Sequence, residues 1–161
     1  MHEPIRQVKP PRGLSRLLYR LPILLYQAGL GWLFGKRFLL LTHTGRVSGL
    51  PRQVVLEVIR YDEHSESYYV VSAFGEQADW FRNIQLTPEV GITIGRRCMG
   101  ALAEIVPQED AERELLDYAR RSPLAARLLP SLIGYHVDGS EEGYRALARQ
   151  LKIVRFSPHG M

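Results

Sequence analysis

The chain has 161 residues, of which 45% are hydrophobic and 24% are charged, a composition typical of one globular domain with a sizeable core. A single cysteine, Cys98, excludes an internal disulfide framework and a multi-cysteine metal site, and it suits a reducing cytoplasm. The net charge of +4 is unevenly placed, because residues 1–60 carry ten Lys or Arg against only Glu3 and Glu57. This basic third favours an anionic partner, such as a phosphorylated cofactor, a membrane surface or a nucleic acid, unless the cations are simply solvated.

The N-terminal segment predicts a polar leader followed by an apolar helix. Residues 1–13 are rich in proline and polar residues, and Ser15 is a candidate N-cap for the run that continues to Phe34. Pro22 should kink or restart this helix, because it lacks the backbone N–H that an interior helical residue donates.

The helical segment 14–37 has two open interpretations. Its longest uncharged stretch is shorter than the about 20 residues of a membrane-spanning helix. Trp32 and Phe34 lie beside Lys36 and Arg37, a combination typical of segments that bind at a bilayer surface. The alternative is an amphipathic helix that packs against its own domain or a twin subunit. The segment therefore predicts either peripheral membrane contact or structural packing.

A donor-rich turn lies at the centre of the stretch Phe38–Arg60. Two runs rich in β-branched residues flank it, and Gly and Pro bound it, which predicts two strands joined by a hairpin. Its hydroxyls, uncrowded glycine amides and guanidinium groups make it a plausible cradle for an anion. The residues concerned are Thr44, Gly45, Arg46, Ser48, Gly49, Pro51 and Arg52. The open alternative is a polar hairpin with solvated arginines.

The remaining chain alternates short strands with helices. Further strands are expected at Gln53–Arg60, Tyr68–Ala73, Val90–Ile94, Cys98–Val106 and Ile153–Phe156. Helices are expected at Glu76–Leu86, Glu109–Arg121, Ser122–Leu132 and Ser140–Leu151. About six short strands in meander order predict a mainly β (α+β) fold, a small six-stranded antiparallel barrel with a helical C-terminal cap over residues 38–161. Cys98 is expected to pack within this sheet.

A second suggestive element joins a strand end to a helix. Ala73-Phe74-Gly75 ends the strand, and the helix that follows carries Trp80, Phe81, Arg82 and Asn83. Backbone amides and aromatic side chains at such a corner can hold a planar ring, unless Trp80 and Phe81 are core residues and Arg82 is solvated. No two histidines lie close in sequence and no metal-ligand spacing occurs, so any enzymatic chemistry should belong to a bound cofactor.

Together, LLLTHTGRVSGLPR, VVSAFG and DWFRNIQLTPEV resemble the deazaflavin-dependent nitroreductase family, whose members resemble flavin-binding split β-barrels. The likeness covers roughly residues 38–106. It implies an FMN-binding-like split β-barrel that binds coenzyme F420, or FMN as in related barrels, and forms a homodimer. It also implies two-electron reduction of a small acceptor such as a quinone, an enone or a nitro compound.

The resemblance also assigns residues to the cofactor. It places the phosphate-bearing tail at the turn, the ring at the strand end, and the helix residues around the pocket. The residues so implied are Thr44, Gly45, Arg46, Ser48, Gly49, Pro51, Arg52, Ser72, Ala73, Phe74, Trp80 and Asn83.

Two positions depart from the family pattern. Many relatives carry lysine where this chain has Val47 and Phe74. The loss of two cations suits a long polyanionic F420 tail less well, so FMN, with one phosphate, stays an alternative. No catalytic residue emerges. Tyr118 and Tyr135 are candidate proton donors only as phenols of the helical cap.

Several functions therefore remain in competition. The first is an F420-dependent reductase in the cytoplasm, with contact at the inner face of the membrane as an added option. The others are an FMN-dependent reductase of the same fold, a cofactor-binding or storage module without turnover, and a membrane-surface interaction protein built on residues 14–37. A nucleic-acid role is disfavoured, because the arginines are not interleaved with strand aromatics in an RNA-binding pattern.

Overall fold

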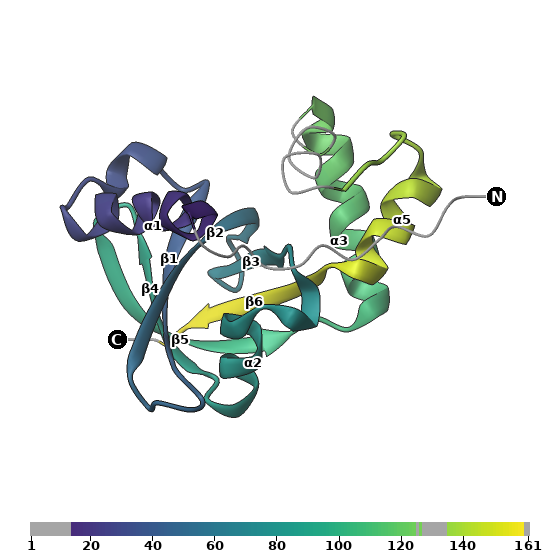
Figure 1. Cartoon of the computed structure of the whole chain (residues 1–161). Helices are drawn as coiled ribbons and strands as arrows, with labels where there is room; N and C mark the ends of the chain where they lie inside the picture. The colour runs from purple at the N-terminus through teal and green to yellow at the C-terminus, as the bar shows by residue number, and fades with distance from the viewer. Residues whose placement is uncertain (1–13, 125, 127–134, 160–161) are drawn as a thin grey trace.

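The computed structural model describes residues 14–124, 126 and 135–159, and for residues 14–19 and Phe34 it describes the backbone alone. Six antiparallel strands close into a barrel (Figure 1). The strands are β1 (Phe38–Thr44), β2 (Pro51–Asp62), β3 (Ser67–Ser72), β4 (Glu89–Ile94), β5 (Arg97–Ile105) and β6 (Lys152–Pro158). The helices are α1 (Leu14–Gln27), α2 (Asp79–Leu86), α3 (Gln108–Arg121) and α5 (Glu141–Gln150), with short 3₁₀ turns η1 (Gly31–Phe34) and η2 (Gly75–Gln77).

The six-stranded antiparallel barrel is confirmed, but the simple meander order is wrong. The strands follow one another around the barrel as β1-β2-β3-β6-β5-β4. The connection through η2 and α2 brings β4 beside β1 rather than beside β3. The last strand, β6, then fills the space between β3 and β5 and closes the barrel.

The barrel interior is filled by alternate strand residues and by one face of α2. Leu39 and Leu41 of β1 point into this core with Val70 of β3. Helix α2 adds Trp80, Phe81 and Ile84 to the same cluster, and the two aromatic rings meet edge to face with centroids 6.0 Å apart. The prediction that this helix turns its aromatics and Ile84 inward is confirmed. Burial of these side chains fixes α2 against one end of the barrel (Figure 1).

A helical cap, formed by α3 and α5, covers the outer face of β3 and β6 (Figure 1). Ile153 and Tyr69 pack there against Ala111 of α3. The Arg60 guanidinium donates two hydrogen bonds to the Glu114 carboxylate, at 2.9 and 2.7 Å, and lies 4.2 Å from the centre of the Tyr69 ring. The cap is thus joined to the barrel by both apolar and ionic contacts.

Two predicted segments lie outside the described residues. These are the leader at 1–13 and most of the helix expected from Ser122 to Leu132.

The first helix is shorter than predicted, because it ends at Gln27 rather than at Phe34. Gly29 takes a φ of +77°, a left-handed conformation that terminates helices. The amides of Gly29 and Leu30 then bond back to the carbonyl oxygens of Tyr26 and Leu25 at 3.1 and 2.8 Å. This pair of bonds is a Schellman motif, after which the chain turns into η1.

Three further expectations are wrong in whole or in part. Pro22 lies inside α1, which continues past it, so it does not restart the helix, and the kink at Pro22 stays a prediction. Ser15 also lies inside the helix rather than before it. Cys98 is exposed rather than packed, because it lies at the start of β5 opposite Thr93, whose hydroxyl oxygen is 3.3 Å from the cysteine sulfur.

Helix α1 is attached to the outer side of β1 and β2. The Tyr26 hydroxyl donates to the Phe38 carbonyl oxygen at 3.0 Å, and the Gln27 amide donates to the side-chain oxygen of Gln53 at 2.8 Å. The division of the chain into 1–37 and 38–161 stays a prediction.

The close approach of Gly31 to the helix gives a test of this attachment. A Cβ at residue 31 would lie 2.5 Å from a ring carbon of Tyr26 and 2.9 Å from the Gly95 carbonyl oxygen. Gly31→Ala should therefore lower the free energy of unfolding by about 1–3 kcal/mol, measured by denaturant titration. The matched control is Gly91→Ala, whose nearest new contact would be an ordinary 3.6 Å to the Thr42 side chain. Equal losses in the two variants would contradict the packing of α1 described here.

Candidate functional site

The turn between β1 and β2 is held in shape by its own hydrogen bonds. The Gly45 amide donates to the Leu50 carbonyl oxygen at 2.9 Å, and the Gly49 amide donates to the Gly45 carbonyl oxygen at 2.8 Å. A Cβ on residue 45 would lie 2.7 Å from the Ser48 hydroxyl oxygen, and Gly49 has a φ of +69°. Both positions therefore need glycine for this conformation.

The outer side of the turn carries donors for an anion. The turn is exposed, and the amides of Val47 and Ser48 have no hydrogen-bond partner among the described residues. The Ser48 hydroxyl oxygen accepts from the Leu50 amide at 3.2 Å and lies 3.5 Å from an Arg52 guanidinium nitrogen. The exposed turn thus offers two amides without a described partner, a hydroxyl group and a guanidinium group, which are donors suited to an anion.

Arg46 points away from this cradle and toward α2. Its guanidinium group forms an ion pair with the Asp79 carboxylate at 3.1 Å and donates to the Asn83 Oδ1 at 2.9 Å. Its backbone amide donates to the same Asn83 oxygen at 3.0 Å. Three interactions therefore fasten the turn to α2, across 37 residues of sequence between Arg46 and Asn83.

A buried histidine completes this arrangement. The Asn83 Nδ2 lies 3.0 Å from the His43 Nδ1, and both side chains are buried. Burial lowers the pKa of His43 to about 4; the nearby Asp79 carboxylate opposes this shift and Arg52 adds to it. We call His43, Arg46, Asp79 and Asn83 the turn–helix cluster.

Sequence reasoning gave His43 and Asp79 no role. The position of His43, two residues after Leu41 and four after Leu39, places it on the inward face of β1. That alternation is a signal that could have identified it as a buried polar residue.

The predicted ring site lies at the end of β3. The Ser72 hydroxyl is fully buried and donates to the Gly75 carbonyl oxygen at 2.9 Å. The Ala73 carbonyl oxygen accepts from the Tyr135 hydroxyl at 3.0 Å. These bonds hold the strand end and η2 in a fixed shape.

Three half-buried apolar side chains, Val54 and Val58 on β2 and Phe74 after β3, are called the apolar shelf here. All three pack against the barrel core. Strand β2 pairs with β1 over Pro51–Glu57 but with β3 only over Val58–Asp62. Partly exposed apolar side chains beside a fixed anion cradle suit a planar ring that carries a phosphate.

The aromatic side chains of α2 are buried in the core and are not part of the apolar shelf. Trp80 is only 7% exposed and Phe81 only 1%, so both rings belong to the core. Arg82 is exposed and donates to the Glu76 carbonyl oxygen at 3.0 Å. Trp80 and Phe81 are thus core residues and Arg82 is exposed, as in the alternative to a ring-binding role. Asn83 is the residue of α2 that contacts the turn.

Both candidate proton donors are already engaged with the protein. The Tyr118 hydroxyl donates to the Glu57 carboxylate at 2.7 Å, and the Tyr135 hydroxyl donates to the Ala73 carbonyl oxygen. Burial and the bond to Glu57 raise the pKa of Tyr118, and burial raises the pKa of Glu57. Tyr118 therefore joins α3 to β2 through its hydrogen bond to Glu57.

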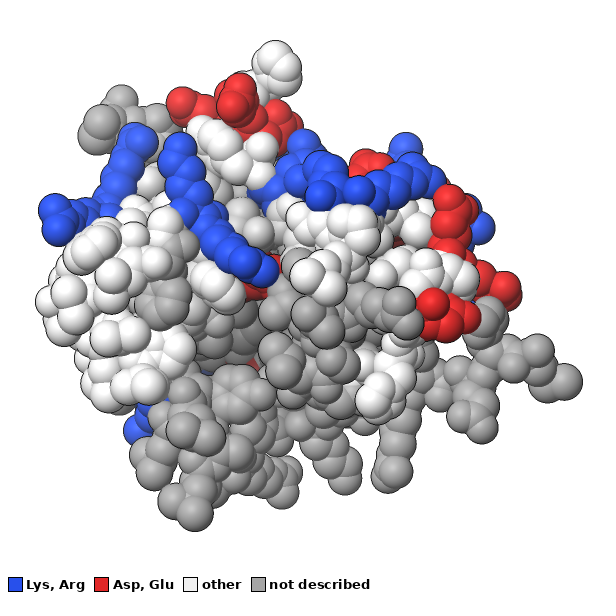
Figure 2. Space-filling model, turned by 90° about the horizontal axis from the view of Figure 1, so that it is seen from above, with Lys and Arg blue, Asp and Glu red and all other residues white. Residues whose placement is uncertain are grey.

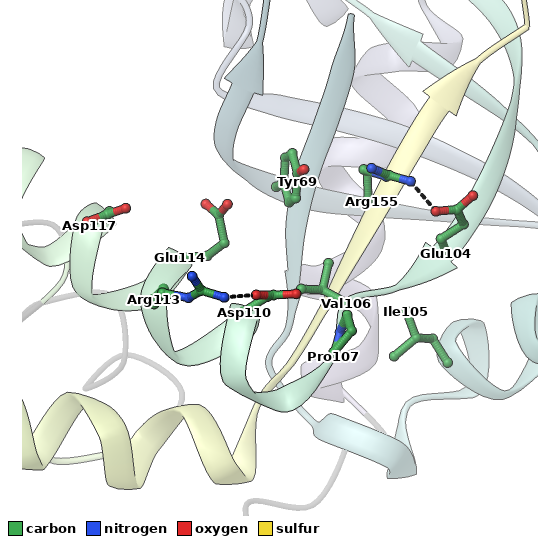
Figure 3. Close-up of a pocket in the computed structure, with 10 residues that line it drawn as sticks. All are labelled: Tyr69, Glu104, Ile105, Val106, Pro107, Asp110, Arg113, Glu114, Asp117 and Arg155. Atoms are coloured by element: carbon green, nitrogen blue, oxygen red, sulfur yellow. Dashed lines mark hydrogen bonds and ion pairs between the residues drawn. The ribbon is translucent and has the colours of Figure 1, made fainter. Parts of the chain in front are cut away.

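A separate pocket of about 400 Å³ lies between α3 and the strands β5 and β6 (Figure 3). It is lined by Tyr69, Glu104, Ile105, Val106, Pro107, Asp110, Arg113, Glu114, Asp117 and Arg155. Its acidic side chains are compensated, since Glu104 pairs with Arg155 and Asp110 with Arg113. This pocket shares no residue with the turn–helix cluster or the apolar shelf, so the candidate site remains at the β1–β2 turn.

Comparisons with known proteins identify the family and the fold of the chain. A family model described as F420H(2)-dependent quinone reductase matches residues 26–126. None of the curated proteins compared with the chain matches it.

Solved structures share the fold at low sequence identity. An F420-H2 dependent reductase is 19% identical with a TM-score of 0.51, over 76% of this chain and 95% of that one. A chain described as a domain-swapped dimer is 16% identical with a TM-score of 0.54, over 90% and 100%. A pyridoxamine 5'-phosphate oxidase-related, FMN binding protein from Nostoc punctiforme is 14% identical with a TM-score of 0.50, over 91% and 81%. These likenesses confirm the FMN-binding-like barrel.

The matched family segment contains the turn, the apolar shelf and α2, and it covers more than half of the sequence. The chain belongs to the F420H(2)-dependent quinone reductase family.

Proposed function

We propose that the protein is an oxidoreductase that transfers a hydride from reduced coenzyme F420 to a quinone. The observation that carries this proposal is the rigid β1–β2 turn, which presents anion donors beside a partly exposed apolar shelf. Family membership supports F420 as the donor and a quinone as the acceptor. Enones and nitro compounds are the alternative acceptors to a quinone.

Some residues of the site position the turn, and others would contact the cofactor. Arg46 and Asn83 hold the turn on α2, while the exposed Ser48 and Arg52 would contact a phosphate. Phe74 and its apolar neighbours would support the ring. Held by these residues, reduced F420 would supply the hydride, and a proton from solvent would complete the reduction of the quinone to a quinol.

FMN remains the alternative cofactor on a specific observation. Val47 is 93% exposed, and Phe74 packs on the core, so neither position supplies a cation to a polyanionic tail. A non-catalytic module that binds the same cofactor is the second alternative, and an assay of quinone reduction separates it from an enzyme.

We also propose a homodimer, supported by the family resemblance, and light scattering of the purified chain would test it.

We further propose that α1 and η1 bind peripherally to an anionic membrane, where lipophilic quinones reside. Exposed apolar side chains gather there: Leu21, Leu24, Leu30, Trp32 and Leu33. Figure 2 shows this end of the molecule as a largely uncharged surface with Lys and Arg side chains along its edge. Lys36 and Arg37 are exposed, and the Arg96 guanidinium lies 5.8 Å from the centre of the Trp32 ring.

This surface suits a bilayer interface rather than its interior. Among the described helices, none has the length and apolar composition that crossing a bilayer requires. Each large apolar side chain contributes about 1.5–3 kcal/mol when fully buried, and each cation about 1 kcal/mol at an acidic lipid surface. Reversible, salt-sensitive binding is the expected result.

The membrane proposal predicts a specific loss of vesicle binding. The double variant Leu24→Ser/Trp32→Ser should reduce the partition constant about tenfold or more, measured by sedimentation with vesicles containing phosphatidylglycerol at low salt. The matched control is Leu86→Ser, an equally apolar, 71% exposed residue on α2, which should sediment like the unmodified chain. If the unmodified chain stays in the supernatant, the apolar surface has a structural role and the membrane proposal is wrong.

Arg46 and Arg52 are both expected to support F420 binding, but only Arg52 should affect its dependence on salt. Arg52→Ala removes a direct contact to phosphate, and Arg46→Ala releases the turn from α2. Each variant should weaken F420 binding about tenfold to a hundredfold, since a hydrogen bond to a charged group contributes about 1.5–3 kcal/mol. Arg52→Ala should also reduce the dependence of binding on salt. Calorimetry tests this with Arg82→Ala as the control, because Arg82 is an exposed arginine that lies on α2 and bonds to Glu76 rather than to the turn. Unchanged affinity in both turn variants, with the fold intact, would mean that these arginines are only solvated.

Cofactor choice can be decided by calorimetry with F420 and FMN side by side. F420 should bind more tightly than FMN, and its affinity should fall less than about tenfold between about 0.05 and 0.5 M salt, because few charges meet. Tight FMN binding with undetectable F420 binding would reverse the assignment.

A further inference from the structure

We propose that His43 is a positioning residue for cofactor binding, whose Nδ1 fixes the side-chain amide of Asn83 and, through it, the backbone of the turn at Arg46. This inference rests on the proposed function, in which the turn holds the phosphate of the cofactor. His43 itself is buried on the inner side of the barrel and belongs to the support of the turn rather than to its anion donors.

The orientation of the Asn83 amide follows from Arg46. Two donors, the backbone amide and a guanidinium nitrogen of Arg46, lie 3.0 and 2.9 Å from one terminal atom of Asn83. Only an oxygen can accept from both, so this atom is Oδ1 and the other is Nδ2. The nitrogen atom therefore faces His43, at 3.0 Å from Nδ1.

That orientation in turn sets the tautomer of His43. Because Nδ2 is a donor, the Nδ1 of His43 must accept, and the imidazole hydrogen resides on Nε2. A hydrogen on Nδ1 would place two donors against each other at this distance. Rotation of the Asn83 amide would relieve that conflict, but it would turn Nδ2 toward the two Arg46 donors and break both bonds.

The charges around His43 come from three elements. Asp79 lies on α2, Arg52 lies opposite His43 on β2, and Arg46 lies on the turn. Burial outweighs the attraction of Asp79, so the pKa of His43 falls to about 4. The stability that neutral His43 contributes is therefore fully present above the ordinary pKa of about 6.5, and it is lost as pH falls through about 4.

Two substitutions separate positioning from packing. His43→Asn places an amide oxygen near the position of Nδ1, so the acceptor is kept while the titration is removed. His43→Leu keeps an apolar side chain of similar bulk and removes the acceptor. At pH 7.5, the leucine variant should bind F420 about tenfold more weakly, and the asparagine variant should stay within about threefold of the unmodified chain.

Nuclear magnetic resonance on the unmodified, ligand-free chain supplies an independent readout. Long-range proton–nitrogen spectra should show His43 as the neutral tautomer protonated on Nε2, with no protonation of Nδ1 above about pH 5. In the leucine variant, the Arg46 amide and the Asn83 side-chain NH₂ signals should shift. In the asparagine variant, they should remain close to their original positions.

The results fall clearly on one side or the other. An Nδ1-protonated tautomer, an unmoved Arg46 amide signal in His43→Leu, or equal F420 affinities in all three chains would overturn the positioning role. If the unmodified chain binds neither F420 nor FMN, the proposed function fails, while the tautomer and the Arg46 signal still decide the role of His43. If His43→Leu does not fold, the tautomer of the unmodified chain and the affinity of His43→Asn decide it, because a weakened asparagine variant contradicts the proposal.

Discussion

The side-chain amide of Asn83 joins α2 to the end of β1 and to the turn that follows it, which lie about 40 residues earlier in the sequence. Its nitrogen atom faces His43 at the end of β1, and its oxygen atom accepts twice from Arg46 in the β1–β2 turn, while its backbone belongs to α2. An amide can satisfy a donor pair and an acceptor at once, which neither a carboxylate nor a hydroxyl group does in this geometry. The turn has its own internal hydrogen bonds, but its position against α2 depends largely on this one buried group and its orientation.

The position of Asn83 is itself a consequence of core packing. Trp80, Phe81 and Ile84 lie on the same helix and are buried in the barrel, so they leave α2 little freedom to slide or rotate. The hydrophobic core thereby sets where the turn is held, and the turn sets where the phosphate donors point. A loss of packing beneath α2 would therefore displace the turn of the proposed cofactor site, even though both aromatic rings belong to the core.

Local patterns in the sequence were sufficient for the strands, the glycine turn and the inward face of α2, because alternation, helical periodicity and Gly or Pro signals act over a few residues. The position of β6 between β3 and β5 could not be predicted in this way, since it depends on closure of the whole barrel. The end of α1 was missed although Gly29 is a local signal, because the apolar pattern continues beyond it. The pairing of Arg46 with Asp79 and Asn83 depends on tertiary contact and has no local sequence signal. The sequence therefore suggested a phosphate as the partner of Arg46.

That pairing changes the electrostatics expected of the site. Asp79 largely compensates the charge of Arg46, which leaves Arg52 as the guanidinium group that faces the outer side of the turn. Backbone amides and one exposed cation are well matched to a single phosphate group, whereas a chain of further carboxylates would find few partners at Val47 or Phe74. If F420 binds, we expect the remainder of its anionic tail to extend into solvent, where salt screens it. Recognition would then depend on the geometry of the turn more than on the summed charge of the cofactor, which is why an amide and a neutral histidine, rather than additional lysines, are the residues that hold this site together.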